Sequence, residues 1–327
     1  MKTAKSIDVA RLALAGQPGG ITVSTLAEAR YFASHGMGDM IYAVGVTPRK
    51  LAEVAALNAG GAAIKVITDD PATASAIAAT GVGALVEVDS GEHRGGMTPD
   101  DGLLLEVASR LGRSLAGVLT HGGHSYAGRD ATALASIAEQ ERAAVVGAAD
   151  RLREAGHRIG IVSMGSSPTA IHAEHLTGVT EVRAGVYMFG DLFQSEILTH
   201  ARQDIAVTVL ASVIGIRPEA HRFLIDAGGL ALSKDRSTAA TPVDFGYGLV
   251  LRPDGSEGFG HSVVAAAYQE HGMVACDEGL PFPPVQVGDL VRLAPNHVCM
   301  TAAAYDRYFL VDADEQVVGE WERVNHW

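Results

Sequence analysis

The sequence has little cysteine, a minority of basic residues and no long apolar run. Two cysteines in 327 residues do not look like the disulfide framework of a secreted protein. Lysine and arginine number 25 against 38 acidic residues, for a formal net charge of −13, so binding to a nucleic-acid backbone has no electrostatic support. No segment is long and apolar enough to span a bilayer, and the N-terminal segment lacks the apolar core of a signal peptide. We therefore expect a cytoplasmic protein without a nucleic-acid or membrane partner.

The composition of the chain predicts a protein with a substantial hydrophobic core. Hydrophobic residues make up 47% of the chain and charged residues 19%. A chain of this length exceeds the range in which one hydrophobic core keeps growing, so two domains are expected. The pattern of the sequence changes near residue 205, which predicts domains over residues 1–204 and 205–327.

The first domain alternates short β-branched runs with alanine-rich amphipathic stretches, a pattern typical of a parallel sheet with helical crossovers. Helices are predicted over residues 25–36 and 131–156. An eighth strand around Met1–Thr3, ahead of a helix over residues 6–16, would complete a (β/α)₈ barrel. The other seven predicted strands lie at residues 20–24, 39–44, 62–68, 84–89, 115–121, 158–165 and 181–189.

The second domain shows alternating apolar runs without long helical patterns. Glycine and proline punctuate these runs, as in the segment PFPPVQVGD. Such a texture predicts an antiparallel β domain.

Polar residues collect where the barrel strands end, which is where barrel enzymes carry their chemistry. Arg94 follows one strand and is expected to face the barrel mouth. His121 and His124 lie in a loop whose glycines favour a tight turn beside a ligand over metal chelation. A lysine in a barrel strand is costly to bury unless it is paired or used covalently, which suggests carbonyl chemistry for Lys2. Lys5 is the competing lysine, and periodicity does not choose between them.

Two neighbouring strand ends suit an anion. Ser166 and Ser167 precede a Pro-Thr step and offer N–H groups and hydroxyls at a helix start. Gly185 allows a ligand to approach the backbone of the next strand. Counting the N-terminal strand, these are strands seven and eight, where barrels often hold a phosphate. Each motif alone also fits ordinary turn chemistry.

His297 and Cys299 form a His-X-Cys triplet behind a Pro-Asn turn signal. On a strand, both side chains point to one face while Val298 faces the other, so a metal-ligand pair is one interpretation of the triplet. The alternatives are core packing of the cysteine and a disulfide between Cys276 and Cys299. The triplet alone does not decide between them.

Seven motifs in one order give a clearer indication. Over essentially its whole length, the chain resembles the fold-type III pyridoxal-phosphate enzymes of the metal-dependent D-serine dehydratase and D-threonine aldolase family. The motifs are KTAK (2–5), EVDSGEHRGG (87–96), THGGHSY (120–126), MGSSPTA (164–170), EVRAGVYMFGD (181–191), IDAGGLALSKD (225–235) and PNHVCMTAAAY (295–305).

The resemblance implies pyridoxal 5′-phosphate as the cofactor. Lys2 matches the cofactor-bearing lysine of the family motif Arg-Pro-His-X-Lys-Thr-His-Lys. Arg94 is then expected near the phenolic oxygen of the cofactor ring, with His121 packed beside the ring. The full set of residues expected to contact the cofactor is Lys2, Arg94, His121, Tyr126, Ser166, Ser167, Gly185, Val186 and Tyr187.

The same resemblance makes His297 and Cys299 the metal ligands. A thiolate with an imidazole indicates Zn²⁺. An aldolase with Mn²⁺ or another hard divalent ion more often has aspartate in the cysteine position.

The implied activity is that of a lyase on D-3-hydroxy amino acids. Cys299 and the HGGHSY loop favour a D-serine dehydratase, which forms pyruvate and ammonia. The alternatives are a D-threonine aldolase with His121 or His124 as the base, a 3-hydroxyaspartate lyase, an amino-acid racemase and a cofactor carrier. A homodimer is expected on the same basis. The role of His271 and the residue facing the pyridine nitrogen stay open.

The lysine motif departs from the family pattern in two ways. Its Arg-Pro-His part has no counterpart ahead of Met1, and Ala4 stands where the motif commonly has histidine. We therefore expect an N-terminally truncated chain whose first strand is incomplete. A chain extended upstream is expected to be more stable and more active, because an incomplete strand leaves its neighbour with unpaired backbone groups.

Overall fold

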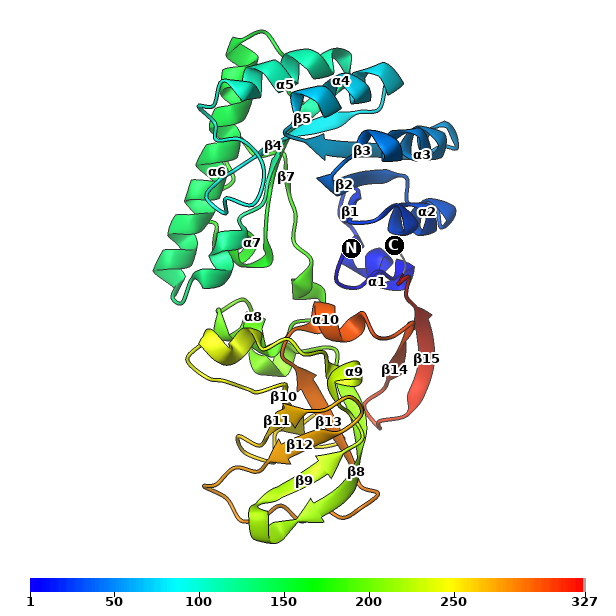
Figure 1. Ribbon diagram of the computed structural model, residues 1–327, viewed down its shortest axis with the longest axis vertical. Coiled ribbons are helices and arrows are strands. Elements are labelled where there is room, and N and C mark those ends of the chain that lie inside the picture. The colour runs from blue at the N-terminus through cyan, green and yellow to red at the C-terminus, as the bar shows by residue number, and fades with distance from the viewer. Residues whose placement is uncertain (326–327) are drawn as a thin grey trace. The chain divides into compact units, whose positions relative to one another are not determined.

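The computed structural model describes residues 1–325. They form two compact units, residues 1–185 and residues 186–325 (Figure 1). The sequence places the boundary later, between residues 204 and 205. The intervening residues carry η3 (Val186–Met188), α8 (Leu192–Glu196) and η4 (Arg202–Asp204), which precede the first strand of the second unit.

The first unit is built on a parallel sheet of seven strands in sequence order. Each strand pairs only with its neighbours in the chain, and the sheet is open between its two edge strands. All seven strands predicted from the apolar runs are confirmed. They are β1 (Ile21–Val23), β2 (Asp39–Gly45), β3 (Ala63–Thr68), β4 (Ala84–Val88), β5 (Leu115–Thr120), β6 (Ile161–Met164) and β7 (Glu181–Val182).

Both faces of this sheet are buried, which explains why its strands are nearly continuous apolar runs. On one face, Ile41, Ile67, Leu85 and Leu119 from four successive strands pack together. The other face packs against the crossover helices in the main core cluster. Full burial of one such side chain stabilises the fold by about 1.5–3 kcal/mol.

Helices follow the strands and lie around the sheet, as Figure 1 shows for α2 to α6. Four of them begin at a residue whose side chain caps the helix: Thr25, Asp70, Asp130 and Ser166. The helices are α1 (Ile7–Ala13), α2 (Leu26–Ser34), α3 (Pro48–Ala59), α4 (Pro71–Thr80), α5 (Leu103–Leu111), α6 (Ala131–Glu154) and α7 (Ser167–His172), with the short turns η1 (Gly112–Ser114) and η2 (Gly123–Ala127).

The eighth strand predicted around Met1–Thr3 is wrong. These residues enter a turn that the N–H of Lys5 closes on the carbonyl of Met1 at 2.8 Å, and Lys5 has a φ of 49°. The amino group of Met1 donates to the carbonyl of Thr22 in β1, but no strand pairing follows. A local turn therefore forms in this segment in place of strand pairing with β1.

The second unit contains a closed barrel of antiparallel strands, which confirms the predicted β domain. Its strand order is β10-β11-β12-β9-β8-β13, and β14 and β15 form a separate hairpin. The strands are β8 (Val209–Arg217), β9 (Arg222–Ile225), β10 (Gly248–Leu251), β11 (Val263–Ala267), β12 (Gly272–Ala275), β13 (Leu290–Pro295), β14 (Arg307–Val311) and β15 (Val317–Glu322). The remaining elements are η5 (Pro218–Ala220), α9 (Gly229–Leu232), η6 (Ser237–Ala240) and α10 (Val298–Ala302).

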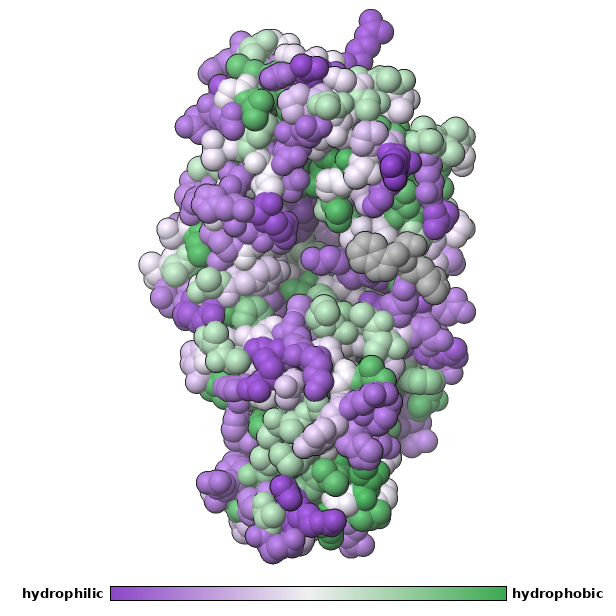
Figure 2. All heavy atoms as spheres, in the orientation of Figure 1, coloured by the Kyte–Doolittle hydropathy of each residue, from purple (hydrophilic) through white to green (hydrophobic). Residues whose placement is uncertain are grey.

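The barrel has its own core, in which Val213, Phe223, Val274 and Val291 are almost fully buried. On the surface, hydrophilic and hydrophobic residues are interspersed over the visible face (Figure 2). No helix within residues 1–325 is long and apolar enough to cross a membrane.

Candidate active site

His121 lies directly after β5, at the carboxyl edge of the parallel sheet. Its Nδ1 donates to the carbonyl of Gly165, which follows β6, at 2.8 Å. This hydrogen bond fixes the tautomer of the neutral ring and leaves Nε2 as an acceptor.

Burial lowers the pKa of His121 to about 4. The hydrogen bond to Gly165 opposes that shift, while the positive charges of Arg183, Arg94 and Lys2 add to it. The imidazole is therefore neutral at physiological pH. The three cations therefore all lie within electrostatic range of this ring.

The two N-terminal lysines have different environments. The amine of Lys5 lies 2.8 Å from Oε1 of Glu28, whose side chain is fully buried and also accepts hydrogen bonds from Ser24. Lys2 is exposed, and its amine makes neither an ion pair nor a hydrogen bond within the described chain. Lys2 is thus the lysine whose amine is available for covalent chemistry.

Arg94 lies on a loop after β4 rather than inside the sheet. Its side chain is 61% exposed and its guanidinium approaches Glu92 at 3.3 Å. Asp89 organises the start of this loop by accepting the N–H groups of Gly91 and His93. Arg94 therefore acts on His121 through its charge, from an exposed position.

The predicted phosphate residues differ in how far their side chains are already engaged. Ser166 caps α7, and its hydroxyl forms hydrogen bonds with the hydroxyls of Ser125 at 2.9 Å and Thr169 at 3.0 Å. Ser167 is buried and accepts the N–H of Gly185 at 3.4 Å. A Cβ on Gly185 would meet nothing closer than 3.7 Å. Ser167 and Gly185 thus bond to each other, and both carry groups of the kind that bind phosphate.

The loop after β5 also holds His124 and Tyr126, both in η2. Neither ring nitrogen of His124 is exposed or has a hydrogen-bond partner within residues 1–325. The ring of Tyr126 lies 6.5 Å from the ring of His121, measured between centroids. Three of the predicted side chains, His121, His124 and Tyr126, thus lie in one short segment. Val186 is buried and Tyr187 is 49% exposed, and both begin the second unit.

Two residues that the sequence reading did not single out are central to this edge of the sheet. Glu141 on α6 is fully buried, and its Oε1 accepts the N–H groups of Gly122 at 2.5 Å and Gly165 at 2.9 Å. Arg183, after β7, donates from Nε to the hydroxyl of Ser163 at 2.8 Å and from Nη2 to the carbonyl of Thr120. The motif EVRAGVY contains Arg183, but the residues predicted from it are Gly185, Val186 and Tyr187.

His297 and Cys299 do not lie on a strand, so the prediction that they share a strand face is wrong. Strand β13 ends at Pro295, and His297 is the N-cap residue of the short helix α10, in which Cys299 lies. The chain turns at Asn296, whose buried side chain bonds to Thr238 and to the carbonyl of Gly246. Neither Cys276 nor Cys299 forms a disulfide.

The two side chains still interact with each other. Burial of His297 by itself lowers its pKa, but a hydrogen bond to Cys299 and the carboxylates of Asp235 and Asp191 raise it to about 9. Nδ1 of His297 lies 2.8 Å from Oδ2 of Asp235. A carboxylate on one ring nitrogen is also common around metal-binding histidines in general. No group of three histidine, cysteine, aspartate or glutamate side chains suited to a metal occurs within residues 1–325.

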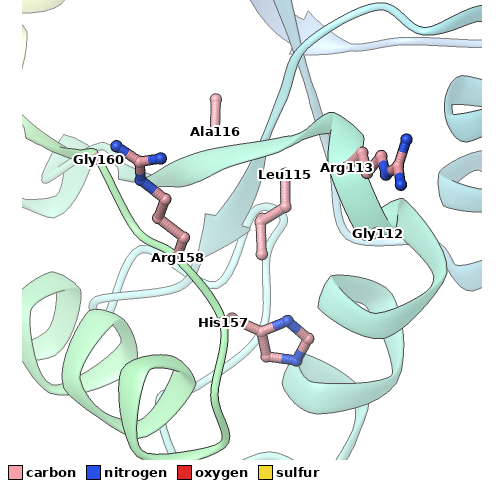
Figure 3. A pocket seen from close by; sticks show the side chains of 7 residues that line it. All are labelled: Gly112, Arg113, Leu115, Ala116, His157, Arg158 and Gly160. Atoms are coloured by element: carbon pink, nitrogen blue, oxygen red, sulfur yellow. The ribbon is translucent and has the colours of Figure 1, made fainter.

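A cavity of about 370 Å³ lies at the opposite edge of the sheet, beside the amino ends of β5 and β6. Arg113, His157 and Arg158 line it, but the two guanidinium groups point away from each other (Figure 3). Chemistry on parallel sheets is carried by the carboxyl ends of the strands. The cavity is therefore separate from the residues around His121.

Two described protein families match this chain. Residues 2–192 match the family described as "Alanine racemase, N-terminal domain", and residues 206–311 match "Putative serine dehydratase domain". The chain is 42% identical to D-threo-3-hydroxyaspartate dehydratase of Delftia sp. over 100% of this chain and 89% of that protein. The chain belongs to the D-serine dehydratase and D-threonine aldolase family of fold-type III pyridoxal-phosphate lyases.

Other members of this lyase family are more distant. D-serine dehydratase of Dictyostelium discoideum is 27% identical over 100% of this chain and 89% of its own. D-threonine aldolase of Arthrobacter is 30% identical over 98% of this chain and 83% of its own. Both chemistries therefore occur among relatives that match nearly the whole chain.

The solved structure of the Delftia lyase superposes with a TM-score of 0.95, again covering 100% of this chain and 89% of that one. That protein is also known as a cysteine-to-alanine mutant in the metal-free form and as a histidine-to-alanine mutant. The two mutated positions are two residues apart, as are His297 and Cys299 in the present chain.

Proposed function

We propose that the protein is a pyridoxal-phosphate- and zinc-dependent dehydratase of D-3-hydroxy amino acids. We propose D-threo-3-hydroxyaspartate as its preferred substrate and D-serine as the second. The observation that carries this proposal is the 42% identity with D-threo-3-hydroxyaspartate dehydratase over the whole chain, against 27% with a D-serine dehydratase. This ranking departs from the sequence expectation, which placed D-serine first.

The proposed function assigns ligand-binding residues in each of the two units. In the first, Lys2 would carry the cofactor, and Ser167 and Gly185 would bind its phosphate. In the second, His297 and Cys299 would bind zinc, with Asp235 fixing the orientation of the imidazole. Arg94, Tyr126, Ser166, Val186 and Tyr187 stay proposed cofactor contacts, of which Ser166 contributes from a hydroxyl already used as a helix cap.

When bound, the cofactor supplies an electron sink for the α-carbon, and zinc supplies a Lewis acid for the β-oxygen. The chain then has two tasks. The amine of Lys2, which has no carboxylate partner within the described residues, would accept the α-proton of the substrate. The neutral ring of His121 packs at the site without adding a positive charge. Loss of water from the substrate followed by hydrolysis yields a 2-oxo acid and ammonia.

The donor set supports zinc over a hard cation. Thiolate and imidazole are ligands that zinc prefers, whereas manganese favours carboxylate and water oxygens. An aldolase would retain the metal but cleave Cα–Cβ, with His121 or His124 taking the proton of the β-hydroxyl. The D-threonine aldolase relative keeps this as the second candidate function.

Product analysis of the holoenzyme with three substrates tests the proposal. D-threo-3-hydroxyaspartate should give oxaloacetate and ammonia with a higher kcat/KM than the conversion of D-serine to pyruvate. Formation of glycine and acetaldehyde from D-threonine as the dominant reaction would show that the protein is an aldolase. Absence of turnover with all three substrates in the zinc-loaded holoenzyme would contradict a lyase of this class.

The lysine assignment is tested with two matched variants. Lys2→Ala should abolish turnover and the cofactor absorbance band without lowering the melting temperature. Lys5→Ala should retain the band but lower stability on the order of 1–3 kcal/mol, because the buried Glu28 loses its charged partner. Turnover that survives in Lys2→Ala would refute the assignment. Light scattering of the same samples checks the proposed homodimer.

A further inference from the structure

Glu141 occupies an unusual position on α6. This helix is 24 residues long and carries many charged side chains. Its neighbour Glu139 is 50% exposed and pairs with Arg142 at 2.6 Å, as expected on a solvated face. The side chain of Glu141 is instead fully buried. Burying a carboxyl group is unfavourable unless hydrogen bonds compensate, so the hydrogen-bond partners of Glu141 determine whether this position is stable.

Those partners are the backbones of two different loops. One oxygen of Glu141 accepts the N–H of Gly122, the residue after His121, at 2.5 Å. The same oxygen accepts the N–H of Gly165, the residue before Ser166, at 2.9 Å. A single side chain on α6 therefore joins the loop after β5 to the loop after β6.

The two loops are also joined to each other. Gly165 presents its N–H to Glu141 and its carbonyl to Nδ1 of His121, the latter at 2.8 Å. The imidazole of His121 and the first turn of α7 are thus fixed relative to one another through one residue, Gly165, and the carboxyl group of Glu141. Ser166 and Ser167 begin at that same turn.

The glycines at these positions fit this arrangement. A Cβ on Gly122 would lie 2.8 Å from the carboxyl group of Glu141. Gly165 has a φ of +144°, and a Cβ there would lie 2.0 Å from the carbonyl oxygen of Arg183. Both backbones approach so closely that a side chain would displace them, which is the specific use of glycine at such sites.

We propose that Glu141 is a positioning residue, which acts through Gly122 and Gly165 to hold His121 and the Ser166–Ser167 turn in the geometry that binds the cofactor. It touches neither substrate nor cofactor. The part of this inference that concerns the cofactor rests on the proposed function. The part that concerns the two loops is a property of the protein alone and can be measured without any ligand.

The test compares Glu141→Ala, Glu141→Asp and Glu141→Gln with Glu139→Gln as the matched control on the same helix. In the cofactor-free protein, hydrogen exchange should accelerate in residues 119–125 and 163–168 for the alanine and aspartate variants. Alanine lacks the acceptor, and aspartate is one methylene too short to reach both N–H groups. Glutamine keeps an acceptor oxygen and should restore most of the protection, while Glu139→Gln should behave as wild type.

Two further readouts separate positioning from a general loss of stability. The pKa of His121, about 4 in the intact site, should move toward 6.5 in Glu141→Ala, measured by NMR titration of the ring, because the loosened loop admits water. Binding of pyridoxal 5′-phosphate, followed by fluorescence titration, should weaken about tenfold or more, as for other residues that orient ligand contacts. Glu141→Gln should rescue both.

The proposal is overturned if Glu141→Ala leaves exchange in both loops and the His121 titration unchanged. It is also overturned if exchange rises equally throughout residues 1–185, since that would be a plain stability effect. Should the alanine variant fail to fold, the aspartate and glutamine variants decide by the same readouts. If the wild-type protein proves inactive on every D-3-hydroxy amino acid, the proposed function fails, but the exchange and titration results still decide the role of Glu141.

Discussion

The imidazole of His121 donates to the carbonyl of Gly165 at 2.8 Å, and burial lowers its pKa to about 4 from an ordinary value of 6.5. A neutral ring suits a position beside a cofactor, because it can pack against a flat aromatic system without introducing charge. The arginines and the lysine nearby reinforce this state. The protonation of a single residue therefore follows from its burial and from three charges on other elements.

This lowered pKa predicts how stability depends on pH. Between pH 6.5 and pH 4, the unfolded chain binds a proton at His121 that the folded chain does not bind. The free energy of unfolding should therefore fall as the pH falls through this window, by up to about 1.4 kcal/mol per pH unit from this group. Glutamine at position 121 can still donate to Gly165 but does not titrate, so His121→Gln should lose stability less steeply. Urea unfolding of the cofactor-free proteins at several pH values measures the two slopes, and parallel curves would contradict the prediction.

At the scale of elements, the seven strands of the first unit could be predicted because burial on both faces makes each a short apolar run. The eighth strand expected at the N-terminus does not form. Met1–Thr3 carries no such run, and a hydrogen bond from Lys5 to Met1 closes a turn there instead. The strand assignment of His297 failed because Asn296 turns the chain through contacts with Thr238 and Gly246. Those partners lie far away in the sequence, where no local pattern records them.

The candidate site could be predicted to a similar degree. Sequence motifs placed His121, Ser167 and Gly185 at strand ends, because glycine and polar residues mark the loops that follow strands, where binding residues often lie. Glu141 could not be predicted as a site residue, because a glutamate in a charged, alanine-rich helix is normally solvent-exposed. Its partners, Gly122 and Gly165, become apparent only when helix α6 and the two loops are seen together.

The contact between α6 and the loop after β5 makes Gly122 sensitive to substitution. In Gly122→Ala, the added Cβ would lie 2.8 Å from the carboxyl group of Glu141, so loop and helix must separate. We expect a loss of stability of about 1–3 kcal/mol and weaker cofactor binding. Gly95→Ala is the matched control, since its Cβ would meet nothing closer than 3.8 Å. Chemical denaturation and cofactor titration of both variants provide the measurement, and equal effects at the two positions would argue against this packing.

At the scale of the whole molecule, most proposed cofactor contacts belong to the first compact unit and the proposed metal ligands to the second. Lys2, His121, Ser167 and Gly185 belong to the first, whereas His297 and Cys299 belong to the second. Each unit has its own buried core. Binding of the cofactor and binding of the metal should therefore be separable, although elimination of hydroxide requires both.

A pair of cysteine variants tests this separation. Cys299→Ala should remove zinc and the elimination reaction but keep the cofactor absorbance band, because the residues proposed to bind the cofactor are untouched.

Cys276 is the matched control. It is buried in the core of the β-barrel, and burial raises the pKa of its thiol to about 11, so it packs as a neutral side chain. Cys276→Ala should therefore retain both zinc and activity, at a cost in stability of roughly 1 kcal/mol. Elemental analysis and the absorbance spectrum of each variant supply the readout. Zinc retained by Cys299→Ala would refute the ligand assignment, and loss of the cofactor band together with the metal would show that the two sites depend on each other.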